Sequence, residues 1–122
     1  MPKKVLIVED YEDSRVLMKF LLESLGCEVS EAEDGAEAFD KFKQIHPDLI
    51  LMDISLPTVD GLTATKVIRQ CEDGGSDVPI IAVTAFGKSC YEEAIEAGCN
   101  DLIGKPIDFD AFEPLVQNYL ST

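Results

Sequence analysis

The sequence predicts a single α/β domain with a doubly wound parallel sheet, and three observations support this prediction. Short apolar runs alternate five times with stretches whose apolar residues recur every three or four positions. Several of these runs are almost entirely apolar, which is typical of parallel strands covered on both faces. With 122 residues, the chain has the length of one ordinary domain. We therefore expect five β-α units over residues 1–122, with right-handed crossovers and helices on both faces of the sheet.

The first strand and the first helix follow from local patterns near the N-terminus. Residues 5–8 are apolar throughout and are followed by two acids, Glu9 and Asp10. Residues 12–25 form an amphipathic helix, because apolar side chains recur at helical spacing and Gly26 follows as a stop signal. The apolar positions that define this helix are Val16, Leu17, Phe20, Leu21 and Leu25.

The next elements continue the alternation of strand and helix. A weaker strand over residues 28–32 leads into a helical pattern that reaches Ile45 and closes before Pro47. The third strand, residues 49–52, is apolar throughout and runs directly into Asp53.

The second half of the chain repeats the same order. A third helix around residues 62–68 precedes a buried strand, PIIAVT, at residues 79–84. A fourth helix over about residues 89–97 is followed by a short fifth strand at residues 101–103. The last helix spans about residues 109–120, with Pro114 at an unusual interior position.

The composition argues against several classes of function. A formal net charge of −14 disfavours binding to nucleic acid or to an anionic membrane surface, because both attractions need clustered Lys and Arg. The four consecutive apolar residues near the N-terminus are too few for a signal peptide or a membrane span, so we expect a cytoplasmic protein. Four scattered cysteines and a single histidine form no zinc-binding pattern and indicate reduced thiols.

Chemically active side chains follow four of the five predicted strands. They are Glu9, Asp10, Asp53, Thr84 and Lys105. Because parallel strands end at the same edge of the sheet, and ligands bind at that edge, we expect these side chains to gather there. Three clustered carboxylates repel one another unless a cation neutralises them, and hard oxygen ligands suit Mg²⁺. The sequence therefore predicts a site for Mg²⁺ and a phosphoryl group, and no organic cofactor.

Four motifs in order give the chain a clear resemblance to a known family. They are LIVED with its acidic pair, DLILMDISLPTVDG with one central Asp, IIAVTA with its Thr, and GKP with its Lys. Together they resemble the receiver domain of response regulators in two-component signalling, similar to the bacterial chemotaxis response regulator. The resemblance covers essentially the whole chain and implies a flavodoxin-like (βα)5 fold.

The resemblance implies a role for each residue at the sheet edge. Asp53 is expected to accept a phosphoryl group from a sensor histidine kinase or a histidine phosphotransfer protein. Asp10, Asp53 and the backbone carbonyl of Ser55 are expected to bind Mg²⁺, with Glu9 acting through a metal-bound water. Phosphorylation is then expected to change how the domain docks an unknown downstream protein.

Two further residues complete the expected site. Lys105 is expected to pair with the phosphoryl group, and Thr84 to move toward that group when it arrives. The domain is expected to catalyse its own phosphorylation and dephosphorylation while acting as a switch rather than as an enzyme. No output domain is expected within residues 1–122, and both a stand-alone regulator and an excised receiver remain open.

Departures from the family pattern concern the route from the site to a partner. Leu102 replaces the aromatic residue or histidine that family members usually have three residues before the Lys, and Ile107 replaces the usual aromatic after KP. Ser55 and Phe86 lie two residues beyond Asp53 and Thr84, where side chains tune the lifetime of the phosphoryl group. We expect the large Phe86 side chain to hinder the approach of water.

Three alternatives share the fold class or the site. A small-molecule phosphatase with Asp53 as its nucleophile would need a second Asp two residues later, where the chain has Ser55. A flavodoxin-like redox protein would need a phosphate-binding loop after the first strand, where EDYED would repel FMN phosphate. A receiver that is never phosphorylated is disfavoured because every chemical residue is present.

Overall fold

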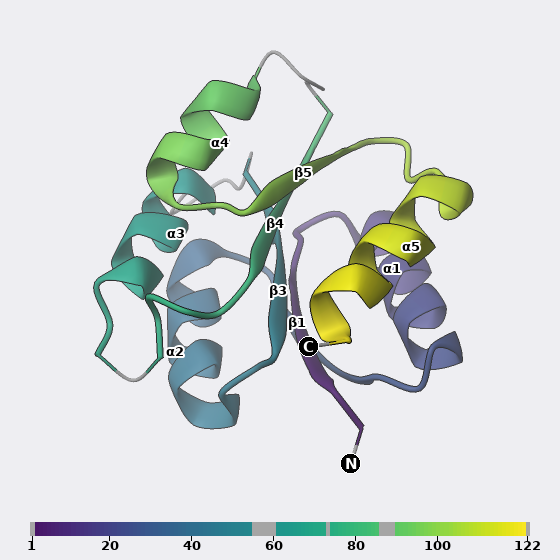
Figure 1. Ribbon diagram of the computed structural model, residues 1–122, viewed down its shortest axis with the longest axis horizontal. Coiled ribbons are helices and arrows are strands. Elements are labelled where there is room, and N and C mark those ends of the chain that lie inside the picture. Colours follow the sequence, from purple (N-terminus) through teal and green to yellow (C-terminus); the bar gives the residue numbers. More distant parts are fainter. Residues whose placement is uncertain (1, 55–60, 73, 86–89, 122) are drawn as a thin grey trace.

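The computed structural model describes residues 2–54, 61–72, 74–85 and 90–121. Its centre is a parallel five-stranded sheet in the order β2-β1-β3-β4-β5 (Figure 1). The strands are β1 (Lys4–Val8), β2 (Glu28–Ala32), β3 (Leu49–Asp53), β4 (Ile80–Thr84) and β5 (Asp101–Gly104). The helices are α1 (Glu12–Ser24), α2 (Gly35–Ile45), α3 (Gly61–Arg69), α4 (Tyr91–Ala97) and α5 (Phe109–Leu120). This arrangement confirms the predicted doubly wound fold.

The strands separate two hydrophobic cores because successive side chains point to opposite faces of the sheet. One core lies under α2, α3 and α4, and includes Leu6, Ile50 and Ala82 from the strands. The other lies under α1 and α5, and includes Ile7 and Leu51. The three central strands are therefore apolar at every interior position, as their sequences predicted.

Helix α1 corrects one expectation from the sequence. Its buried side chains are Met18, Leu21 and Leu22. Three residues of the predicted apolar set are instead exposed: Val16 at 55%, Leu17 at 41% and Phe20 at 64%. The sequence misled because α1 carries two apolar stripes, and helical spacing alone does not show which stripe faces the sheet.

Short-range signals fix the ends of several elements. The Asp34 carboxylate accepts a hydrogen bond from the Glu37 N–H at 2.8 Å and caps the start of α2. His46 ends α2 in a left-handed conformation, with φ of 47°. Pro114 lies inside α5 without ending it, and the Asp110 carbonyl four residues earlier belongs to an exposed residue that water can reach.

Arg69 ties the ends of three elements together at the amino side of β4. Its guanidinium donates to the backbone carbonyls of Gly75 (2.8 Å), Val78 (2.6 Å) and Gly98 (2.8 Å). It also donates to Asn100 Oδ1 at 2.8 Å, and that oxygen accepts the Ile80 N–H at 2.9 Å. The end of α3, the start of β4 and the end of α4 are thereby held by one side chain.

Among the described residues, no helix is long and apolar enough to cross a membrane. The four cysteines are unpaired in the structure, and Cys99 is buried.

Candidate functional site

The alternation of side chains along the strands brings three predicted residues to one face at the carboxyl edge of the sheet. Glu9 continues the series Val5 and Ile7, whose side chains belong to the core under α1 and α5. Asp53 continues Leu49 and Leu51, and Lys105 continues Ile103, in the same core. Each polar side chain therefore extends an apolar stripe to the carboxyl end of its strand.

Lys105 lies between two buried carboxylates. Its Nζ is 2.6 Å from Glu9 Oε1 and 3.2 Å from Asp53 Oδ2. Glu9 is fully buried, and Asp53 is 2% exposed. The ammonium group of Lys105 therefore supplies one positive charge to two buried carboxylates.

The pKa values of these groups report the same balance. Burial, followed by the Asp53 carboxylate, raises the pKa of Glu9 to about 7, although the hydrogen bond from Lys105 acts in the opposite direction. Burial alone would lower the pKa of Lys105, but Glu9 and Asp53 raise it overall. The Lys105 ammonium is thus insufficient to keep the pKa of Glu9 in its ordinary range.

The acidic group of the site has the composition of a metal site. Each of Glu9, Asp10 and Asp53 offers a carboxylate oxygen, and these oxygens lie within 4.8 Å of one another. Asp10 is exposed to solvent, whereas the other two are buried. Hard oxygen donors with one solvent-facing member fit Mg²⁺, which keeps several of its waters. A divalent ion would also offset the negative charge that Lys105 leaves unbalanced.

Thr84 and Lys105 are joined through the backbone. The Lys105 N–H donates to the Thr84 carbonyl at 2.8 Å, and Thr84 is a buried residue at the end of β4. The peptide bond between Lys105 and Pro106 is cis. Two residues named from the sequence, Ser55 and Phe86, lie outside the described residues.

The two departures from the family pattern fall on opposite faces of the sheet. Leu102 is half-buried and packs against the core under α2, α3 and α4. Ile107 is half-buried and packs against the core under α1 and α5. Both residues therefore contribute apolar packing at positions where the family usually has an aromatic ring.

Three backbone contacts support the site, two of them at Glu9 and one at Asp53. The Tyr11 N–H donates to Glu9 Oε2 at 3.2 Å, and Arg15 Nη1 donates to the Glu9 carbonyl at 3.1 Å. A Cβ at Gly61 would collide with the backbone carbonyl oxygen of Asp53, so only glycine allows α3 to start this close to β3. Sequence reasoning missed the contacts of Tyr11 and Arg15 because neither residue belongs to a recognised motif. The only signal in the sequence was their position close to Glu9.

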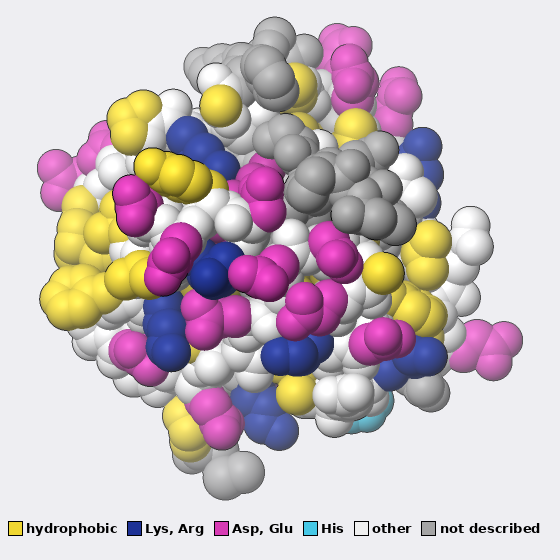
Figure 2. All heavy atoms as spheres, turned by 180° about the vertical axis from the view of Figure 1, so that it is seen from behind, with side chains coloured by type: hydrophobic (Ala, Val, Ile, Leu, Met, Phe, Trp, Pro, Cys, Tyr) yellow, Lys and Arg dark blue, Asp and Glu magenta, His cyan; other side chains and the backbone are white. Residues whose placement is uncertain are grey.

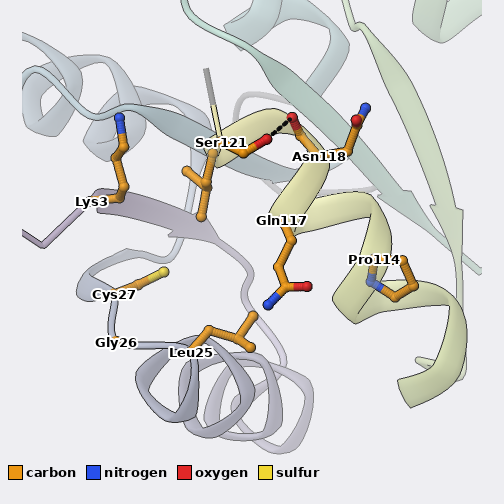
Figure 3. Close-up of a pocket in the computed structure, with 9 residues that line it drawn as sticks. Lys3, Leu25, Gly26, Cys27, Pro114, Gln117, Asn118 and Ser121 are labelled. Atoms are coloured by element: carbon orange, nitrogen blue, oxygen red, sulfur yellow. Dashed lines mark hydrogen bonds between the residues drawn. The ribbon is translucent and has the colours of Figure 1, made fainter.

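A hollow lies at the opposite, amino end of the sheet. It has a volume of about 590 Å³ and lies between the end of α1, the residues before β1 and β2, and the end of α5 (Figure 3). It is lined by Lys3, Leu25, Gly26, Cys27, Pro114, Gln117, Asn118, Leu120 and Ser121. None of the residues predicted to carry chemistry lines it.

The family model of the response regulator receiver domain matches residues 5–117. The chain belongs to this family. The polar-differentiation response regulator DivK of Brucella anthropi is 44% identical over 121 residues, covering 98% of each chain. These matches confirm the resemblance that the four motifs indicated, and with it the fold and the receiver function in two-component signalling. They favour this function over the phosphatase and redox alternatives.

Two solved receiver structures share the fold closely. The receiver domain of sensor histidine kinase PA1611 from Pseudomonas aeruginosa is 34% identical, with a TM-score of 0.90 and full coverage of both chains. That structure has a magnesium ion coordinated in its active site cleft. The receiver domain of Ssk1 from Saccharomyces cerevisiae, solved with the histidine phosphotransfer protein Ypd1, is 29% identical, with a TM-score of 0.88 over 97% of this chain and 88% of that one.

Proposed function

We propose that this receiver accepts a phosphoryl group on Asp53 from a phosphohistidine of a sensor histidine kinase or a histidine phosphotransfer protein. The observation that carries the proposal is the position of Lys105 Nζ, 2.6 Å from Glu9 Oε1 and 3.2 Å from Asp53 Oδ2. A carboxylate nucleophile beside a fixed ammonium group can receive a phosphoryl group because the ammonium offsets the charge that arrives with it.

In the proposed reaction, Asp53 Oδ attacks the phosphorus of the donor phosphohistidine. A P–O bond forms, the N–P bond breaks, and the imidazole leaves with its electron pair. Lys105 would then pair with the new phosphoryl oxygens, and Thr84, at the end of the adjacent strand, would donate its hydroxyl to one of them. Attack by water on the same phosphorus would later release phosphate and restore the Asp53 carboxylate.

Asp10, Asp53 and the Ser55 carbonyl would hold Mg²⁺, and Glu9 would contact it through water. When bound, Mg²⁺ supplies positive charge that disperses the charge of the transferring group. The three carboxylate oxygens within 4.8 Å of one another support this assignment, as does the magnesium ion in the related PA1611 receiver.

The outer face of α1 supports a protein as the phosphoryl donor. Its exposed apolar side chains, Val16, Leu17 and Phe20, line a hollow with the acids Glu12 and Asp13. Figure 2 shows hydrophobic side chains gathered along the left edge, the side on which α1 lies in that view. Because α1 begins two residues after Asp10, a partner on this face could bring a histidine to Asp53. Its surface should have an apolar centre and a basic rim.

Residues 1–122 would act as a single receiver domain that signals by changing how it docks a downstream protein. A cytoplasmic location is part of the proposal, because four unpaired cysteines suit a reducing compartment.

Intact mass after incubation with acetyl phosphate and Mg²⁺ tests the acceptor. We expect the parent to gain one phosphoryl group and Asp53→Asn to gain none. Asp77→Asn, a change of an exposed acid away from the site, is the matched control and should be phosphorylated like the parent. Equal phosphorylation of Asp53→Asn and the parent would refute the assignment.

Phe20→Ala tests the donor surface. We expect transfer from a phosphorylated phosphotransfer protein to slow by about tenfold, because a central apolar contact is lost, while transfer from acetyl phosphate stays unchanged. Val67→Ala removes an exposed apolar side chain from α3 and serves as the control. If both variants slow protein-to-protein transfer equally, α1 is not the donor surface.

A further inference from the structure

The Arg15 side chain of α1 contacts the backbone between Glu9 and Asp10. Its Nη1 donates to the Glu9 carbonyl at 3.1 Å. That carbonyl lies beyond the last residue of β1, whereas the Glu9 N–H still donates to the Ala32 carbonyl of β2 at 3.0 Å. The backbone at Glu9 is therefore held on one side by the sheet and on the other by the Arg15 side chain.

The guanidinium of Arg15 is itself held in place from the sheet edge. Its Nε is 3.2 Å from Glu31 Oε1 on β2, and its Nη1 is 3.4 Å from Glu33 Oε1. The Arg15 side chain is 15% exposed, so these contacts are only partly screened by solvent.

We propose that Arg15 is a positioning residue for the metal site, acting through the peptide that links Glu9 to Asp10. The carbonyl of Glu9 and the N–H of Asp10 belong to one planar peptide unit, so fixing the oxygen also fixes the backbone that carries the Asp10 carboxylate. Groups that orient a metal ligand raise affinity without touching the ion. This inference rests on the proposed role of Asp10 and Asp53 in binding Mg²⁺.

The positioning role predicts an effect of opposite sign to simple electrostatics. Removing a positive charge near a cation site should strengthen cation binding if charge alone mattered. If Arg15 positions Asp10, its removal should weaken binding, because the carboxylate no longer stays opposite Asp53.

Direct binding of Mg²⁺ by calorimetry, and of Mn²⁺ by electron paramagnetic resonance, measures this effect. We expect Arg15→Met to bind both ions about tenfold more weakly. Arg15→Lys, which keeps a donor for the carbonyl, should recover part of the loss. Lys19→Met is the matched control, because Lys19 pairs with the same Glu31 at 3.6 Å but lies one turn further along α1. It should bind the ions at least as tightly as the parent.

Metal-free unfolding of each variant separates positioning from loss of fold. Unchanged or tighter ion binding by folded Arg15→Met would overturn the proposal, as would an equal loss in Lys19→Met. Should Arg15→Met fail to fold, Arg15→Lys gives the decision, since it keeps the positive charge but replaces the guanidinium that joins Glu31 to the Glu9 carbonyl. Ion binding weaker than in the parent supports positioning, and unchanged binding contradicts it. A parent that binds no Mg²⁺ would instead refute the proposed function.

Discussion

The two ends of the sheet differ in how they combine space and charge. The amino end has the hollow of about 590 Å³, where Gln117 extends from α5 toward α1 and the lining cation, Lys3, is exposed (Figure 3). The carboxyl end instead has two buried carboxylates, Glu9 and Asp53, around the Lys105 ammonium. The described lining of the hollow at the amino end thus includes an exposed cation, whereas the described residues at the carboxyl end bury two carboxylates beside one ammonium group.

This difference indicates that buried charge, rather than the presence of a hollow, marks the candidate functional site. Burying charged groups costs free energy, and pairing them recovers this cost only in part. Clusters of buried charge are therefore often found at functional sites. A hollow lined by exposed polar groups has no such cost.

Among variants at the two ends of the sheet, we expect the largest effect from replacing Lys105, the cation at the carboxyl end. Lys105→Met should slow phosphorylation by acetyl phosphate about 100-fold, because the charge of the transferring group loses its fixed counterion. It should also destabilise the metal-free fold, since Glu9 and Asp53 stay buried without their ammonium partner. Phosphorylation rate and urea unfolding with and without Mg²⁺ measure both effects.

Lys66→Met is the control for Lys105, because Lys66 is exposed on α3. It should change neither the rate nor the stability appreciably. If Lys105→Met is phosphorylated at the parental rate, buried charge at this edge is not what drives the reaction.

A smaller effect concerns Glu9, whose pKa is raised to about 7 in the folded, metal-free protein. Because the folded state holds a proton that the unfolded state releases, stability should fall as pH rises from the ordinary glutamate range through about 7. Glu9→Gln removes this dependence. Relative to the parent, the variant should therefore gain roughly 2 to 3 kcal/mol between about pH 5 and about pH 8.

Urea unfolding in a metal chelator measures the difference between parent and Glu9→Gln at each pH, so that titrations common to both proteins cancel. Adding Mg²⁺ should reduce the gain, because a nearby divalent ion favours the ionised carboxylate. A difference that stays constant with pH would show that Glu9 keeps its ordinary acidity.

The smallest effect is expected at the amino end. Gln117→Ala enlarges the hollow there and should alter the free energy of unfolding by less than about 0.5 kcal/mol. Its phosphorylation rate should match that of the parent. A slower rate in this variant would mean that the two ends of the sheet are coupled, and the contrast drawn between them would fail.

The fold was predictable because its three central strands are short and apolar at their interior positions, and strong stop signals such as Gly26 and Pro47 separate strands from helices. The orientation of α1 was not predictable. Both of its apolar stripes have helical spacing, and only packing against the sheet selects Met18 and Leu22 for the core.

The site was predictable to the extent that chemistry follows strand ends. Glu9, Asp53 and Lys105 meet because parallel strands place their carboxyl ends together, which is a property of topology. The contact from Arg15 to the Glu9 carbonyl depends on the angle at which α1 leaves the sheet, and no sequence pattern encodes that angle.

The contacts of Arg69 have a mechanical consequence for α4, which lies on the face of the sheet opposite α1. By accepting from Arg69 at 2.8 Å, the Gly98 carbonyl makes the C-terminal end of α4 a fixed pivot on α3 and β4. A short rod held at one end moves by swinging the other, and the opposite end of α4 begins at Tyr91. An event at Asp53 that displaces α4 would therefore be magnified at Tyr91 and damped at Gly98.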